Sequence, residues 1–168
     1  MLNMSAKERP PAPGQQGVSP HPPRRGAVVY DILRTAGHLR RFYGDLFEEH
    51  GITFQQYNVV RILRGAGPQG LPTLEIVKRM IEETPGITRL LDRLESKQLI
   101  RRERPSNNRR KVICFVTQKG LDLLRRMDAP IQEKVKAAAR CLTDSEVGEL
   151  LTCLERIRET TSSAIPLK

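Results

Sequence analysis

The chain has 168 residues, enough for one compact domain with a sizeable core but short for two independent domains. Its formal net charge of +10 indicates a polyanionic partner, either nucleic acid or an anionic membrane surface. No segment approaches the roughly 20 apolar residues of a bilayer span, and the N-terminus carries no apolar secretory signal, so we expect a soluble, cytoplasmic protein without a membrane partner.

Residues 1–26 are rich in proline, glycine, glutamine and serine and have almost nothing apolar to bury. This composition predicts a disordered leader. Its four basic residues leave open a second interpretation, that of a basic arm touching DNA.

Apolar residues recur at three- and four-residue steps from Val28, which predicts a first helix to about Glu49, ended by Gly51. A second helix is expected after Thr53, a suitable N-cap, and should close in the glycine-rich segment 65–70.

The segment Thr73 to Met80 has the pattern of a short helix, with Leu74, Val77 and Met80 facing inward.

The next helix should run from Pro85 to about Lys97, because Thr84 suits an N-cap and proline suits the first helical position. Helical periodicity separates an apolar face from a polar one. The apolar face contains Ile87, Leu90, Leu91 and Leu94, and the polar face contains Pro85, Thr88, Arg89, Asp92 and Ser96.

Two strands, 101–104 and 111–116, are predicted around the turn-forming segment 105–108, giving a hairpin with a basic tip. Thr117 suits the N-cap of a further helix that Pro130 should kink or break. The segment 143–146 matches a capping box and predicts a final amphipathic helix.

A short helix, a turn, a helix with an exposed face and a basic hairpin are the parts of a winged helix-turn-helix, in their usual order. From Lys78 to Lys111 there are eleven Lys or Arg residues against five acids. This surplus coincides with the exposed helix and the hairpin, which favours duplex DNA binding over a merely solvated surface. A non-specific or RNA-binding module is the alternative, but the same segment has no aromatic residue for base stacking.

Four segments, 52–57, 84–95, 108–110 and 116–120, resemble the MarR (multiple antibiotic resistance regulator) family in their residues, order and spacing. The resemblance covers about residues 27–160. It implies a transcriptional repressor that acts as a homodimer on a pseudo-palindromic operator and responds to a ligand. The expected fold is mainly α with a small β-hairpin wing, a DNA-binding lobe at about 53–117 and dimerisation helices at about 27–50 and 118–162, all within a domain spanning 27–165.

The resemblance places the start of the recognition helix at Pro85 to Arg89, with Arg89 as the candidate for a guanine contact. Arg109, at the wing tip, is the candidate for the minor groove. The family's Asp-x-Arg wing motif is altered, because Asn108 replaces the acid and only Arg110 is retained. The expected DNA contacts are Thr73, Thr84, Pro85, Gly86, Thr88, Arg89, Asp92, Arg93, Arg109, Arg110 and Lys111.

Many members of the family bind small phenolic or aromatic molecules where the dimerisation helices meet the DNA-binding lobe. By this resemblance the candidate ligand contacts are His38, Arg41, Phe42 and Tyr57. A packed or surface role is the alternative for each.

Three widely spaced cysteines match neither a disulfide framework nor a metal clamp, and we expect packing rather than a thiol redox switch for Cys114, Cys141 and Cys153. The histidines lack the spacing of a metal site. No grouping of nucleophile and base or phosphate loop is present, so we expect no enzyme activity, metal or cofactor.

Overall fold

The computed structural model describes residues 25–82, 85–105 and 111–164. The chain divides into two compact units, Met1–His38 and Leu39–Lys168, with the boundary inside the first helix. All candidate site residues except His38 belong to the second unit.

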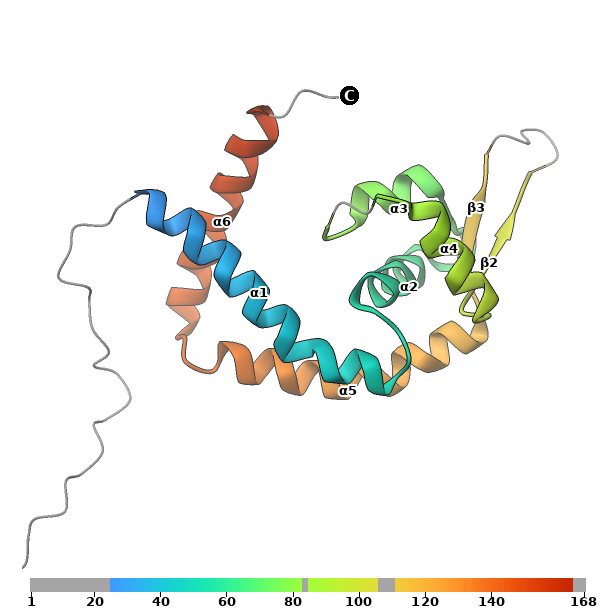
Figure 1. Cartoon of the computed structure of the whole chain (residues 1–168), viewed down its shortest axis with the longest axis horizontal. Coiled ribbons are helices and arrows are strands. Elements are labelled where there is room, and N and C mark those ends of the chain that lie inside the picture. Colours follow the sequence, from blue (N-terminus) through green and yellow to red (C-terminus); the bar gives the residue numbers. More distant parts are fainter. Residues whose placement is uncertain (1–24, 83–84, 106–110, 165–168) are drawn as a thin grey trace, which may run out of the picture. The chain divides into compact units, whose positions relative to one another are not determined.

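The described residues form six α-helices, a short 3₁₀ helix at Gly67–Gln69 and three strands (Figure 1). Within these ranges no helix is long and apolar enough to cross a membrane. The predicted class, mainly α with a small β-hairpin, is confirmed. The helices are α1 (Arg25–Glu49), α2 (Phe54–Ala66), α3 (Thr73–Arg79), α4 (Ile87–Ser96), α5 (Gln118–Ala139) and α6 (Asp144–Ala164), and the strands are β1 (Leu71–Pro72), β2 (Ile100–Glu103) and β3 (Ile113–Val116).

The first two helices end and begin as predicted. Gly51, with φ of 64°, follows α1, and Thr53 caps α2. The Thr53 hydroxyl accepts a hydrogen bond from the Gln56 amide, and the Gln56 side chain accepts one from the Thr53 amide, so both free backbone donors are satisfied.

The predicted inward face of α3 is wrong. Ile76 is fully buried, whereas Leu74 is 75% exposed and Val77 is 37% exposed. In a helix of seven residues the apolar positions fit two different faces, and packing against the sheet and α2 selects the face that carries Ile76. Met80 packs against the core, as predicted.

The start of α4 also differs from the prediction. The helix begins at Ile87, and Gly86 precedes it in the left-handed conformation with φ of 88° and ψ of 35°. Pro85 therefore lies in the preceding turn rather than at the first helical position. Gly86 adopts this left-handed conformation at little cost because it has no Cβ. The prediction placed the helix start at Pro85 and did not consider a left-handed glycine after it.

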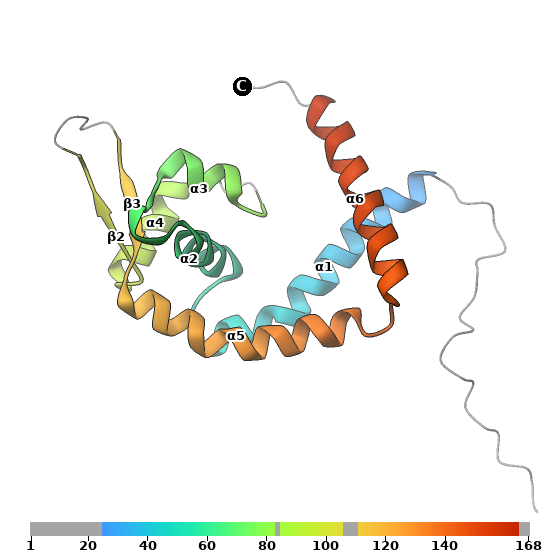
Figure 2. The same ribbon diagram turned by 180° about the vertical axis from the view of Figure 1, so that it is seen from behind.

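The predicted hairpin is confirmed as the antiparallel pair β2 and β3, in which Ile100 faces Val116 and Glu103 faces Ile113. The unpredicted strand β1 pairs with the other edge of β3, giving the order β1-β3-β2. Two residues, one of them proline at the sheet edge, are too few to show a strand pattern. Figure 2 shows this sheet at the opposite end of α5 from α6.

The last two helices are capped as predicted. The Thr117 hydroxyl accepts from the Gly120 amide at the start of α5, and Thr143 and Glu146 form the capping box of α6. Pro130 does not break α5, which continues to Ala139. Pro130 has no amide hydrogen to donate within the helix, but the packing of Ile131 against the core favours continuation of α5 past this position.

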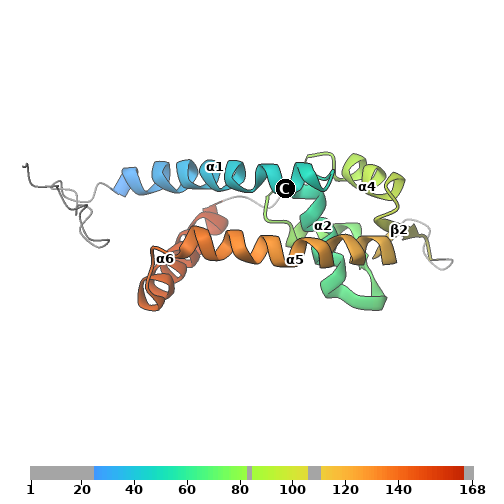
Figure 3. The same cartoon turned by 90° about the horizontal axis from the view of Figure 1, so that it is seen from below.

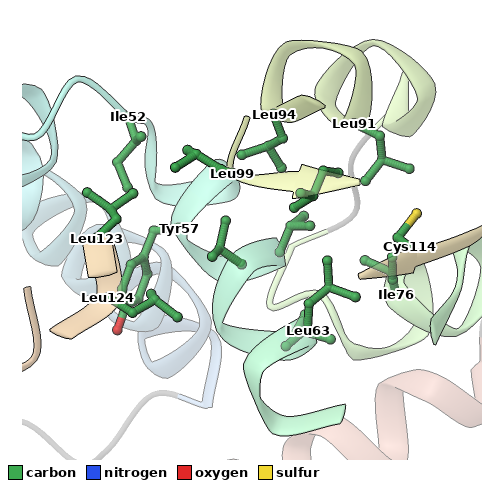
Figure 4. Packing of buried hydrophobic residues seen from close by; sticks show 14 of the residues in the cluster. Ile52, Tyr57, Leu63, Ile76, Leu91, Leu94, Leu99, Cys114, Leu123 and Leu124 are labelled. Carbon is green, nitrogen blue, oxygen red and sulfur yellow. The ribbon is translucent and has the colours of Figure 1, made fainter. Parts of the chain in front are cut away.

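The core is built on α2, which lies between α4 and α5 (Figure 3). Leu63 of α2 packs in one buried cluster with Leu91 and Leu94 of α4 and Leu124 of α5 (Figure 4). Burial of each such side chain contributes about 1.5–3 kcal/mol to folding. Arg64 of α2 donates to both carboxylate oxygens of Asp128 on α5, at 3.0 and 2.8 Å. The core therefore fixes one face of α4 and leaves the other in solvent.

Candidate nucleic-acid interface

The exposed face of α4 carries the predicted recognition residues. Leu91 and Leu94 are buried, and Ile87 and Leu90 are half-buried. The predicted contact residues of this helix and the turn before it that the structure describes are all exposed, namely Pro85, Gly86, Thr88, Arg89, Asp92 and Arg93. A helix held by one face and free on the other has the form needed to enter a major groove.

The two flanks of this exposed face differ in charge. Arg89, Arg93 and Lys97 follow one another at four-residue steps along one flank. Asp92 and Glu95 lie on the opposite flank, toward β2. The recognition helix thus has a cationic side and an acidic side.

The two acids of this side are paired with Arg102 of β2. Arg102 Nη2 donates to Asp92 Oδ1 and to Glu95 Oε2, both at 2.6 Å, and its Nε donates to Glu95 Oε2 at 2.9 Å. The Arg102 backbone amide donates to Glu95 Oε1 at 3.1 Å. These hydrogen bonds hold the pKa of Glu95 below, and that of Arg102 above, its ordinary value. They join α4 to the first wing strand.

Arg102 and Glu95 hold α4 against the first wing strand, and the sequence prediction did not single them out. Both were counted only as charges in a basic segment. Glu95 lies on a helix and Arg102 on a strand, so the periodicity of neither element brings the two side chains together, and the pairing appears only once α4 and β2 are folded together.

Two other predicted contacts lie beside the sheet. Thr73 begins α3 and is half-buried, and its amide donates to the Val112 carbonyl at 3.3 Å. Its side chain also hydrogen-bonds Cys114. Burial raises the pKa of the Cys114 thiol, and this hydrogen bond opposes the rise. Lys111 is exposed just before β3.

Three predicted DNA contacts, Thr84, Arg109 and Arg110, lie outside the described residues, as does Asn108. Around them, Arg101 is exposed on β2, with its guanidinium 4.1 Å from the centre of the Phe115 ring. Arg101 also forms an ion pair with Glu103, so the excess of positive charge at the described base of the wing comes from the exposed Arg104 and Lys111.

The candidate ligand residues have unlike surroundings. Tyr57 is buried, with its ring 5.3 Å from that of Phe47. Phe42 is partly exposed and lies under the Lys134 ammonium, which is 4.4 Å from the ring centre. Arg41 and His38 are exposed. Within the second unit Tyr57 therefore has the surroundings of a packed core residue, which is the alternative to a ligand contact at this position.

The expectation that the cysteines are packed holds for Cys114 alone. Cys114 is buried in β3, whereas Cys141 and Cys153 are exposed thiols, because the turn between α5 and α6 and α6 itself lie outside the core cluster. Among the described residues no group of three or more His, Cys, Asp or Glu side chains is placed to hold a metal ion.

Comparison with known proteins agrees with this arrangement. The sequence model of the MarR family matches residues 52–112. The HTH-type transcriptional regulator TtmR of Methylorubrum extorquens is 36% identical over 101 residues, which cover 60% of this chain. The match spans about half, 51%, of that relative's length.

A solved MarR transcription factor from Planctomyces limnophilus is 31% identical, and the likeness covers 80% of this chain and 98% of that one with a TM-score of 0.63. The chain belongs to the MarR family. Bordetella bronchiseptica BpsR has a similar fold, at 18% identity and TM-score 0.71, with 79% of this chain and 98% of that one covered. The α3–α4 pair and the β2–β3 hairpin are thus the helix-turn-helix and wing of a MarR-family protein.

Proposed function

We propose that this MarR-family protein is a sequence-specific regulator of transcription that binds duplex DNA as a homodimer on a pseudo-palindromic operator. The observation that carries the proposal is α4, which buries Leu91 and Leu94 while Thr88 and Arg89 are exposed to solvent. In this role α4 reads base edges, and the cations of the wing neutralise phosphates.

Apolar side chains left in solvent support a homodimer. On α6, Leu150 is 46% exposed and Leu151 is 58% exposed, and on α1 Leu33 is also largely exposed. Exposed apolar side chains on helices outside the DNA-binding lobe fit a self-complementary interface with two-fold symmetry. We assign the lobe to residues 53–117 and dimerisation to residues 27–50 and 118–162.

Selection of bound fragments from a random duplex pool tests this function. We expect enriched sequences with two inverted half-sites about one helical turn apart, since each α4 of a dimer would enter one major groove. Enrichment without a common sequence, or stronger binding to structured RNA, would favour the non-specific or RNA-binding alternative.

We propose repression as the mode of regulation, because a dimer bound over a promoter blocks polymerase. A reporter placed behind the selected operator should lose expression when the protein is present. Activity in the cytoplasm, and the absence of enzyme activity, metal and cofactor, are parts of the same proposal.

A small aromatic acid is the candidate effector. BpsR, which shares the fold, is a protein whose DNA binding is regulated by 6-hydroxynicotinic acid. His38, Arg41, Phe42 and Tyr57 stay the proposed contacts. Thermal shifts against a panel of aromatic acids, with the same acids as competitors of operator binding, test this, and no shift or release with any of them counts against it.

A further inference from the structure

A groove runs along the cationic side of α4, between this helix and the N-terminal end of α2. One hollow of about 530 Å³ is lined by Thr53, Gln55, Arg89 and Arg93 together with the turn residues before α4. A second, of about 440 Å³, shares Thr53 and Arg93 with the first and continues to Lys97. The two hollows are therefore neighbours along the same side of α4, and together they are called the groove below.

The groove is strongly cationic. Its first hollow has two arginines and no acidic residue in its lining, and its second adds Lys97 against Glu48. Among the described residues, the guanidinium of neither Arg89 nor Arg93 has a hydrogen-bond or ion-pair partner, whereas the guanidinium of Arg102 on the other side of α4 is engaged by two acids. The unneutralised charge of the recognition helix thus faces α2.

Gln55 brings a neutral donor to the same groove. Its Nε2 donates to Glu82 Oε2 at 3.3 Å, which orients the amide and leaves its second hydrogen available. Glu82 in turn accepts from Arg40 Nε at 2.6 Å, so its negative charge is compensated. Lys97 is less available, because its Nζ donates to the Gly51 carbonyl and to Gln56.

We propose that a phosphodiester of one operator strand lies in this groove, with its charge neutralised by Arg93 and its oxygen hydrogen-bonded by Gln55. The proposal rests on the DNA-binding function proposed above and adds α2, which precedes the helix-turn-helix, to the contact surface. A phosphate contact fixes the position of α4 and carries no base information, so Arg93 and Arg89 have different roles.

The test compares Arg93→Gln and Arg93→Lys with Arg140→Gln, a matched change at the exposed end of α5. Operator affinity is measured at several salt concentrations, on the selected site and on scrambled DNA. For Arg93→Gln we expect roughly tenfold weaker binding on both DNAs and a salt slope smaller by about 0.9 per bound protomer. Arg93→Lys should keep the slope, and Arg140→Gln should match the unmodified protein.

Phosphate ethylation of the operator locates the contact. Arg93→Gln should lose interference at one or two phosphates in each half-site and keep it elsewhere, and Gln55→Glu should weaken binding at those same phosphates. If Arg93→Gln left the salt slope and the ethylation pattern unchanged, the groove proposal would be overturned. A relaxed preference at one base pair in Arg93→Gln would overturn it as well, because Arg93 would then contact a base. Failure of the unmodified protein to select any operator would instead overturn the proposed function.

Discussion

Arg102 shows how one residue decides the chemistry around it. Its side chain is 23% exposed and is shared between Asp92 and Glu95, so it offsets one of the two negative charges that would repel DNA phosphates from α4. Asp92 was predicted to contact DNA, and this pairing makes it equally a residue that positions the wing. Only Arg102 joins α4 to β2 in this way among the described residues.

The Arg102 pairing predicts a pH dependence of stability. Because the folded-state pKa of Glu95 is lowered, its stabilising contribution is complete above the ordinary glutamate pKa of about 4.3 and is lost as pH falls through the lower folded value. Glu95→Gln should cost about 1 kcal/mol or less at pH 7, since Glu95 is 39% exposed. The difference in melting temperature from the unmodified protein should shrink toward pH 3, and Glu159→Gln serves as the control.

Arg89 is the residue for which we predict loss of specificity. Arg89→Ala should weaken operator binding by about 1–3 kcal/mol and relax the preference at one base pair, because a bidentate guanine contact is lost. Repeating the selection with the variant measures this directly. Equal weakening on every sequence would reassign Arg89 to a phosphate.

At the scale of elements, α4 and α5 depend on glycines that the periodicity did not single out. Gly86 gives α4 its left-handed entry. Gly120, in the first turn of α5, lies so close to Leu99, the residue before β2, that an added Cβ would overlap the Leu99 carbonyl oxygen. This close approach sets the distance between α5 and the wing.

A matched pair of substitutions tests the Gly120 contact. Gly120→Ala should lower the free energy of unfolding by about 1–3 kcal/mol, because the carbonyl it meets belongs to the backbone. Gly148→Ala, in open space within α6, should raise it by about 0.5–1 kcal/mol through helix propensity. Urea unfolding of both variants gives the comparison, and equal effects would contradict the close approach.

At the scale of the whole molecule, α6 has an apolar face without a cover in the single chain. We predict that Leu151→Glu, which puts a charge on that face, yields a monomer in sedimentation experiments and lowers operator affinity, because a single lobe loses the second half-site. Thr152→Glu, at the adjacent exposed position off this face, should stay dimeric. A dimeric Leu151→Glu protein would place the interface elsewhere.

The sequence by itself determined the helices with strong caps, the hairpin and the basic charge of the DNA-binding segment. Thr53, Thr117 and the segment 143–146 act locally, through hydrogen bonds to amides three residues away, so their sequence pattern is sufficient. The exposed face of α4 was predictable for the same reason, since ten residues of clear periodicity admit one buried face.

Tertiary structure alone decided the features that depend on distant neighbours. It chose the face of α3, added β1 to the sheet, carried α5 through Pro130 and paired Arg102 with Glu95. It also formed the cationic groove, which joins Gln55 and Arg93 across 38 positions of sequence. Contacts of this kind depend on how two elements pack against each other, and the spacing of residues within one element does not specify that packing.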